Sequence, residues 1–199
     1  MSSLQKIKQI CKRSILWLHT RAHPRRVILG AGYTAFSGWT LTDIDTLNIL
    51  KELDWGIYFK KSSIDAMLAE HVWEHMTASD GLQAARLCFK FLKKDGYLRI
   101  GVPDGFHPDP AYIECVKPSG TGNGAQDHKV LYTYKTLGAL LQEAGFELHF
   151  LEYFDETGKF HQSDWNPEMG SVLRSARFDP RNYDGQLKYT SLIVDAIKA

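Results

Sequence analysis

The chain has little cysteine, almost no net charge and no long apolar run, and each shortage excludes a class of protein. Its 199 residues include only three cysteines, Cys11, Cys88 and Cys115, which are far apart and form no C-x-x-C pair. Such spacing indicates neither a disulfide framework nor a thiolate zinc site. The formal charge of +1 gives no electrostatic support for binding to nucleic acid or to an anionic membrane. No segment approaches the roughly 20 apolar residues that a membrane-spanning helix needs.

The first 24 residues are basic and contain no acidic residue, but they lack a long apolar run and a small-residue cleavage site. We therefore expect residues 1–24 to form an amphipathic helix packed on the protein, not a signal peptide; a mitochondrial presequence is the alternative. Hydrophobic residues make up 44% of the chain, which is ordinary globular composition. Residues 25–199 are accordingly expected to form one domain, and the protein is expected to be cytoplasmic.

The rest of the sequence alternates short β-branched runs with amphipathic helices. Strands are predicted at residues 25–32, 38–45, 63–69, 97–104, 147–154 and 189–198, and helices at 78–96 and 133–146. This order predicts an α/β fold with a mostly parallel sheet, in which the last two strands pair antiparallel because no helix separates them. Residues 105–130 and 155–188 are expected to be insertions. A loop as long as the first is typical of a lid or binding element, and the second could form a wall of the substrate site or an oligomer contact.

The string GAGYTA (Gly30–Ala35) fits the dinucleotide-binding pattern G-x-G-x-x-A by its letters. Only six residues separate Gly32 from Trp39, which is too few for a crossover helix of normal length. A smaller adenosine cofactor without a pyrophosphate tolerates the shorter unit, because the glycines let the backbone approach a ligand closely. Asp43 would then accept hydrogen bonds from the ribose. In the alternative, the glycines only form a turn that Asp43 caps.

The string EHVWEH (Glu70–His75) contains H-x-x-E-H, the inverted zinc-protease signature. On a helix, His71 and His75 would be i,i+4 neighbours able to bind zinc. That site requires a long helix and a third ligand from a second helix. Here the motif directly follows a predicted strand, Gly81 ends the helical run soon after, and no downstream acid is marked out as a ligand. We therefore predict no metal, and a metallohydrolase using His71 and His75 is the weaker alternative.

Five motifs occur in an order that resembles the class I S-adenosylmethionine-dependent methyltransferases: GAG, GWTLTDID, EHVWEH, FLKKDGYLRIGVPD and LGALLQEAGF. The resemblance covers roughly Arg25 to Tyr153 plus the closing strand pair. It is nearest to a small bacterial, methyltransferase-11-like branch with GAG, GW, D and EHVxEH motifs. It implies a three-layer Rossmann-like fold, with a mostly parallel seven-stranded sheet and a C-terminal antiparallel pair, and S-adenosylmethionine as cofactor. The implied cofactor-binding residues are Gly30, Ala31, Gly32, Asp43, Asn48, Ala69, Glu70 and His71.

The activity implied by the resemblance is methyl transfer to a small-molecule or saccharide acceptor, which the residues do not identify. If the acceptor is a hydroxyl, His75 or His128 would act as the base, with Glu70 as the alternative. A catalytically weak or inactive binding protein on the same fold is also left open, because Thr34 stands where the third glycine of the first motif is expected. We expect no nucleic-acid partner, and a homodimer is left open.

Overall fold

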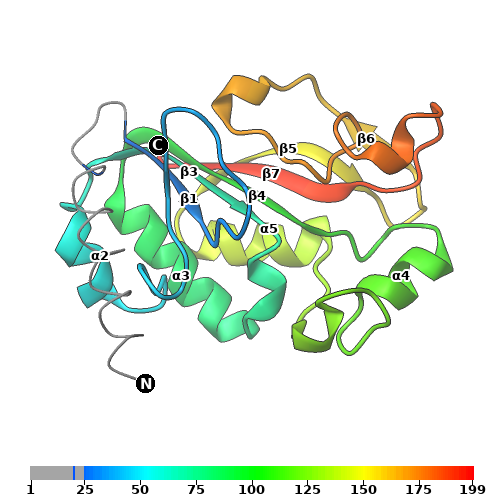
Figure 1. Cartoon of the computed structure of the whole chain (residues 1–199), viewed down its shortest axis with the longest axis horizontal. Coiled ribbons are helices and arrows are strands. Elements are labelled where there is room, and N and C mark those ends of the chain that lie inside the picture. Colours follow the sequence, from blue (N-terminus) through cyan, green and yellow to red (C-terminus); the bar gives the residue numbers. More distant parts are fainter. Residues whose placement is uncertain (1–19, 21–24) are drawn as a thin grey trace.

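The computed structural model describes Thr20 and residues 25–199. Seven strands form one sheet in the order β2-β1-β3-β4-β7-β5-β6. Figure 1 shows β1, β3, β4, β7 and β5 side by side in this sheet. The strands are β1 (Arg26–Leu29), β2 (Trp39–Leu41), β3 (Ile64–Glu70), β4 (Leu92–Pro103), β5 (Glu147–Phe154), β6 (Phe160–Gln162) and β7 (Ser191–Ile197). The predicted helix over residues 1–24 falls outside the described residues, apart from Thr20.

The sheet is mixed. Strands β2, β1, β3 and β4 pair in parallel, whereas β7 pairs antiparallel with β4 and β5, and β6 pairs antiparallel with β5. Three of the six pairings are therefore antiparallel, and the prediction of a mostly parallel sheet is wrong. The physical reason is that β5 leads into β6 by a hairpin and into β7 without a crossover helix, and such connections impose antiparallel pairing. The antiparallel pairing predicted for the last two strands, which are β5 and β7, is confirmed.

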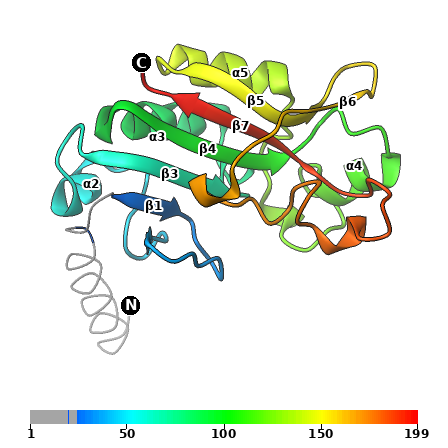
Figure 2. The same ribbon diagram turned by 90° about the horizontal axis from the view of Figure 1, so that it is seen from above.

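Helices cover one face of this sheet. They are α2 (Glu52–Tyr58), α3 (Ala78–Phe91) and α5 (Tyr134–Glu143), and their buried side chains form the main core with alternate residues of the strands. Trp55 of α2 stacks on Phe91 of α3 with ring centroids 5.2 Å apart. The strands turn their other residues away from this layer, since side chains alternate along a strand. Figure 2 shows α3 and α5 on one side of the sheet.

The second face is covered by an irregular segment of the second insertion. Trp165 and Val172 pack there on Ile28, Leu68 and Ile193, which come from three strands. No described α-helix contributes to this cluster, because α4 (Pro110–Val116) packs separately on Tyr189 at the end of the molecule. Within the described residues, the expected third layer of helices is therefore replaced by extended chain.

Buried charges hold that segment in place. The Arg99 guanidinium of β4 binds the Asp195 carboxylate of β7 through two contacts of 2.7 and 2.8 Å, and donates to the carbonyl oxygen of Gly170 at 2.7 Å. The Glu152 carboxylate of β5 accepts hydrogen bonds from the Trp165 indole at 3.0 Å and from the backbone N–H of Ala176 at 2.8 Å. These polar groups, and not helix packing, fix the cover of the second face.

Other boundaries differ from those predicted. The helix predicted over residues 78–96 ends at Phe91, because Leu92 is fully buried and pairs with Ile64 in the sheet. The short helix α2 was not predicted. Its seven residues include Gly56, and only Trp55 and Tyr58 are buried, so its periodicity is weak. The predicted insertion at residues 105–130 contains α4. None of the described helices has the length and apolar character needed to cross a membrane.

Candidate functional site

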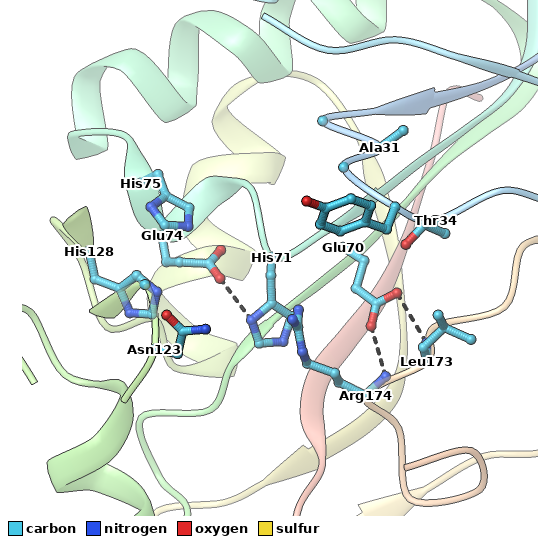
Figure 3. Close-up of a pocket in the computed structure, with 14 residues that line it drawn as sticks. Ala31, Thr34, Glu70, His71, Glu74, His75, Asn123, His128, Leu173 and Arg174 are labelled. Atoms are coloured by element: carbon cyan, nitrogen blue, oxygen red, sulfur yellow. Dashed lines mark hydrogen bonds and ion pairs between the residues drawn. The ribbon is translucent and has the colours of Figure 1, made fainter. Parts of the chain in front are cut away.

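A cavity of about 480 Å³ lies at the carboxyl ends of β1 and β3. This is where open α/β sheets place their ligands, and the volume is within the usual range for small-molecule sites. Figure 3 shows the cavity walls. They are formed by Gly30, Ala31, Gly32, Tyr33, Thr34, Glu70, His71, Glu74, His75, Asn123, Gly124, His128, Leu173 and Arg174.

The glycine loop has the backbone that its sequence predicts. Gly30 and Gly32 have φ angles of +61° and +52°, in the left-handed region that favours glycine. A Cβ atom on Gly30 would lie 2.7 Å from a methyl group of Val72, so the close packing of the two segments requires glycine there. A Cβ atom on Gly32 would meet nothing within 4 Å, so this backbone faces open space that a ligand can approach. Residues 30–38 contain no helix, which confirms the shortened unit.

Three predicted cofactor-binding residues, Asp43, Asn48 and Ala69, do not line the cavity. The Asp43 carboxylate accepts hydrogen bonds from the backbone N–H groups of Gly32, at 3.2 Å, and Ile44, at 2.7 Å. It therefore caps the glycine turn, as the alternative interpretation expects. The Asn48 side chain accepts from the N–H of Leu50 at 3.0 Å, and Ala69 is fully buried. The ribose role of Asp43 stays a prediction.

The EHVWEH segment does not form the helix that a zinc-protease site requires. Strand β3 continues through Glu70, His71 adopts a left-handed φ of 55°, and only Trp73–His75 form a single 3-10 turn. The turn is fixed by the fully buried indole of Trp73, which donates to the carbonyl oxygen of Gly81 at 3.2 Å. The i,i+4 geometry of a zinc protease is therefore absent.

His71 is held through both ring nitrogens. Its Nε2 atom lies 3.0 Å from the Ser191 hydroxyl, and its Nδ1 atom lies 3.0 Å from Oε1 of Glu74. The Glu74 side chain is 1% exposed. Burial opposes ionisation of this carboxyl, yet the neighbouring His71 imidazole keeps the pKa of Glu74 below its usual value. An ionised carboxylate thus lies at the base of the cavity.

Glu70 acts as an anchor for the second insertion. Its carboxylate accepts hydrogen bonds from the backbone N–H groups of Leu173 at 3.1 Å and Arg174 at 2.7 Å (Figure 3). Leu173 and Arg174 are exposed and line the cavity. The sequence indicated only in general terms that residues 155–188 could form a wall of the substrate site. Nothing in its residue pattern marks these two positions.

His75 and His128 come together from segments far apart in the chain, with ring centroids 4.8 Å apart and an interplanar angle of 81°. The Nδ1 atom of His128 lies 2.7 Å from the carbonyl oxygen of Val116. Because a carbonyl only accepts, Nδ1 carries the proton, and Nε2 of the neutral ring keeps a free lone pair. Burial lowers the pKa of His75, although the Glu74 charge opposes this shift. The structure thus brings both predicted bases into one cavity.

No protein-family model matches the chain, and no curated protein matches it. Solved structures do. A methyltransferase from Thermotoga maritima, S-adenosylmethionine-dependent, superposes with a TM-score of 0.54 at 14% identity, covering 98% of this chain and 95% of that one. A structure from Listeria monocytogenes assigned to the same class has a TM-score of 0.51 at 12% identity, covering 95% and 97% of the two chains.

The fold is that of the S-adenosylmethionine-dependent methyltransferases. A third similar structure comes from a complex of two proteins. It is a Haloferax volcanii complex between the methyltransferase activator Trm112 and a protein assigned as a methyltransferase, with a TM-score of 0.51 at 9% identity, covering 96% of this chain and 93% of that one. At these identities the similarity establishes the methyltransferase fold, and the chemistry has to be argued from the cavity.

Proposed function

We propose that this protein transfers a methyl group from S-adenosylmethionine to a small-molecule or saccharide acceptor. The observation that carries the proposal is the cavity itself. It joins a glycine loop with open space beside Gly32 to two histidines, His75 and His128, on the far wall. On a methyltransferase fold, this arrangement supports a cofactor surface and candidate bases within one cavity.

The residues present fit an adenosine cofactor with a charged amino-acid end. The open backbone at Gly32 would lie against it, since a Cβ atom there would meet nothing within 4 Å. The exposed Arg174 lines the same cavity and offers a guanidinium group to a carboxylate. His71, fixed through both ring nitrogens, forms a rigid part of the wall.

The bound cofactor would supply an already activated methyl group, so the chain has only to align the acceptor and manage one proton. His128 suits the second task, because its Nε2 lone pair is left free by the hydrogen bond from Nδ1 to Val116. His75 suits it as well, because its lowered pKa keeps the ring neutral near pH 7. Glu70 does not suit it, because its carboxylate already binds two backbone N–H groups.

A non-catalytic binding protein is the second candidate function. One observation favours it. Two acids near strand ends, Asp43 and Glu70, both use their carboxylates to accept hydrogen bonds from the protein's own backbone. A metallohydrolase using His71 and His75 is disfavoured, because His71 has both nitrogens engaged and the motif is not helical.

Binding of the cofactor gives the first test. Titration with S-adenosylhomocysteine to 100 times its dissociation constant should stabilise the protein by about 2.7 kcal/mol, which raises Tm by roughly 5–10 °C for a domain of this size. Differential scanning fluorimetry measures the shift, with adenosine diphosphate as a ligand control. No shift with either S-adenosylmethionine or S-adenosylhomocysteine would refute both the enzyme and its cofactor. A shift without methyl transfer to any acceptor tested would favour the binding protein.

Replacement of Asp43 gives a second test, aimed at the ribose assignment. Asp43→Ala should weaken S-adenosylhomocysteine binding by about 1.5–3 kcal/mol if the carboxylate turns from the Gly32 N–H to the ribose hydroxyls. Isothermal titration calorimetry measures the affinity. The matched control is Asp45→Ala, which removes the next acid of the same segment and should leave the affinity unchanged. Equal affinities for the two variants would show that Asp43 only caps the turn.

A further inference from the structure

Three side chains at one end of the cavity form a cluster of metal-ligand type. One carboxylate oxygen of Glu74 and one ring nitrogen each of His75 and His128 lie within 4.8 Å of one another. Figure 3 shows the three gathered on the wall opposite Glu70 and Arg174. Two of them come from the turn after β3, and His128 comes from the end of the first insertion.

The burial of the Glu74 carboxylate is a second, independent reason to expect a ligand at this cluster. Its side chain is 1% exposed, and Oε1 is paired with His71. Its Oε2 atom has no hydrogen-bond partner anywhere in residues 25–199. A carboxyl oxygen buried without a hydrogen-bond partner is costly, and such groups are rare in folded proteins unless they serve a ligand. The Glu74 side chain also lines the cavity, next to His75 and His128.

His128 is prepared for coordination. Its Nδ1–H group donates to the carbonyl oxygen of Val116 at 2.7 Å, which fixes the ring orientation and leaves Nε2 as the ring atom for a metal. A backbone carbonyl on the far nitrogen is the usual outer-shell partner of a metal-binding histidine. His71 plays a comparable positioning role for Glu74, since its Nδ1 atom holds Oε1 of the carboxylate.

We propose that Glu74, His75 and His128 form a binding site for a divalent transition-metal ion, with zinc as the expected occupant. Two imidazoles and one carboxylate suit Zn²⁺, whereas Mg²⁺ and Ca²⁺ prefer oxygen ligands alone. In tetrahedral geometry, ligand atoms about 2.0–2.2 Å from one ion lie about 3.3–3.6 Å apart, so side-chain rotations that draw the three groups together by about 1 Å would close the cluster around it. Three protein ligands leave one coordination position open toward the cavity.

This site differs from the sequence-based prediction, which was that the protein binds no metal. It also differs from the His71–His75 pair of the zinc-protease signature. It keeps His75 but takes Glu74 and His128 in place of His71, because the chain turns at His71 instead of continuing as a helix. The site goes beyond methyl transfer, and a bound ion would occupy the His75 and His128 nitrogens that the proposed function uses as bases. Metal binding is measured without the methyl donor, so either proposal can fail alone.

The test is metal binding by the full chain. After treatment with EDTA and dialysis, the protein is titrated with Zn²⁺ by calorimetry, and bound zinc is counted by mass spectrometry. One Zn²⁺ per chain is expected, with no comparable binding of Mg²⁺. Glu74→Gln and His128→Ala should each weaken Zn²⁺ binding by more than about 100-fold, since even loss of an outer-shell partner costs about 10- to 100-fold. His71→Ala should lie in that lower range.

The matched control is His149→Ala, which removes an exposed histidine of β5 outside the cavity and should leave Zn²⁺ binding unchanged. The circular dichroism spectrum and the metal-free Tm of each variant verify folding; if Glu74→Gln does not fold, His128→Ala decides. The proposal is overturned if no stoichiometric Zn²⁺ binds. It is also overturned if His128→Ala binds Zn²⁺ as tightly as the His149→Ala control.

Discussion

Replacing Arg99 by leucine should destabilise the protein by about 3–5 kcal/mol, the usual cost of breaking one side of a buried ion pair. The Arg99 side chain is 1% exposed and binds both oxygens of Asp195. Leucine would leave that carboxylate buried and unpaired. It would also remove the hydrogen bonds to the carbonyl oxygens of Asn166 and Gly170, at 3.2 and 2.7 Å.

Urea denaturation measures the change, and two further variants interpret it. Arg86→Leu removes an exposed ion pair with Glu143, in which both side chains are more than half exposed, so its effect should stay below about 1 kcal/mol. The double variant Arg99→Leu with Asp195→Leu should recover most of the loss, because no charge is left buried. A single Arg99→Leu variant as stable as Arg86→Leu would contradict the role given to the ion pair.

The Arg99–Asp195 ion pair also helps to hold one wall of the cavity. Arg99 holds the carbonyl oxygen of Gly170, and the chain continues from there to Leu173 and Arg174, which Glu70 binds at the cavity wall. A charge in the middle of a buried strand and a carboxylate at a strand end therefore fix one segment at two points. This explains how an insertion without long helices or strands forms part of the cavity.

The sequence predicted most of the helix-covered half of the fold, α2 excepted, because the continuous buried apolar runs of β1, β3 and β4 leave few alternatives. It did not predict the other half. Arg99 within YLRIGVPD and Asp195 within SLIVDAI break the apolar pattern, yet each partner lies 96 residues from the other. Pairing over such a separation leaves no periodic signal. The cover of the second face was missed for the same reason, whereas β6 was missed because its three residues are too few to form a periodic pattern.

For the site, Gly30–Gly32 and EHVWEH were both singled out in the sequence, and the fold brings them together at the carboxyl ends of β1 and β3. The roles within EHVWEH could not be predicted, because they depend on residues beyond the motif. Glu70 is used by the backbone of Leu173 and Arg174, and His71 by Ser191. His75 and His128 were predicted separately as bases, and only the fold reveals that they lie together beside a buried Glu74.

Asp104 should make the stability of the protein depend on pH with a sign opposite to that of a paired surface carboxylate. It is fully buried at the end of β4, and burial raises the pKa of its carboxyl to about 6, although hydrogen bonds from the backbone N–H groups of Phe154 and Phe106 oppose the shift. Between about pH 4 and pH 6 the folded state therefore holds a proton that the unfolded state has lost. Stability from this group is present below about pH 4 and is lost as pH rises through 6.

Asp104→Asn should remove this dependence, because the amide stays neutral at every pH. The variant loses part of the acceptor capacity for two N–H groups, which lowers its stability by a constant amount. The free energy of unfolding of the unmodified protein minus that of the variant should therefore fall by about 3 kcal/mol between pH 4 and pH 7.5. Asp155→Asn is the control of opposite sign, because a hydrogen bond from His161 holds the pKa of Asp155 below its usual value. Curves for Asp104→Asn and the unmodified protein that stay parallel from pH 4 to 7.5 would show that Asp104 ionises normally despite its burial.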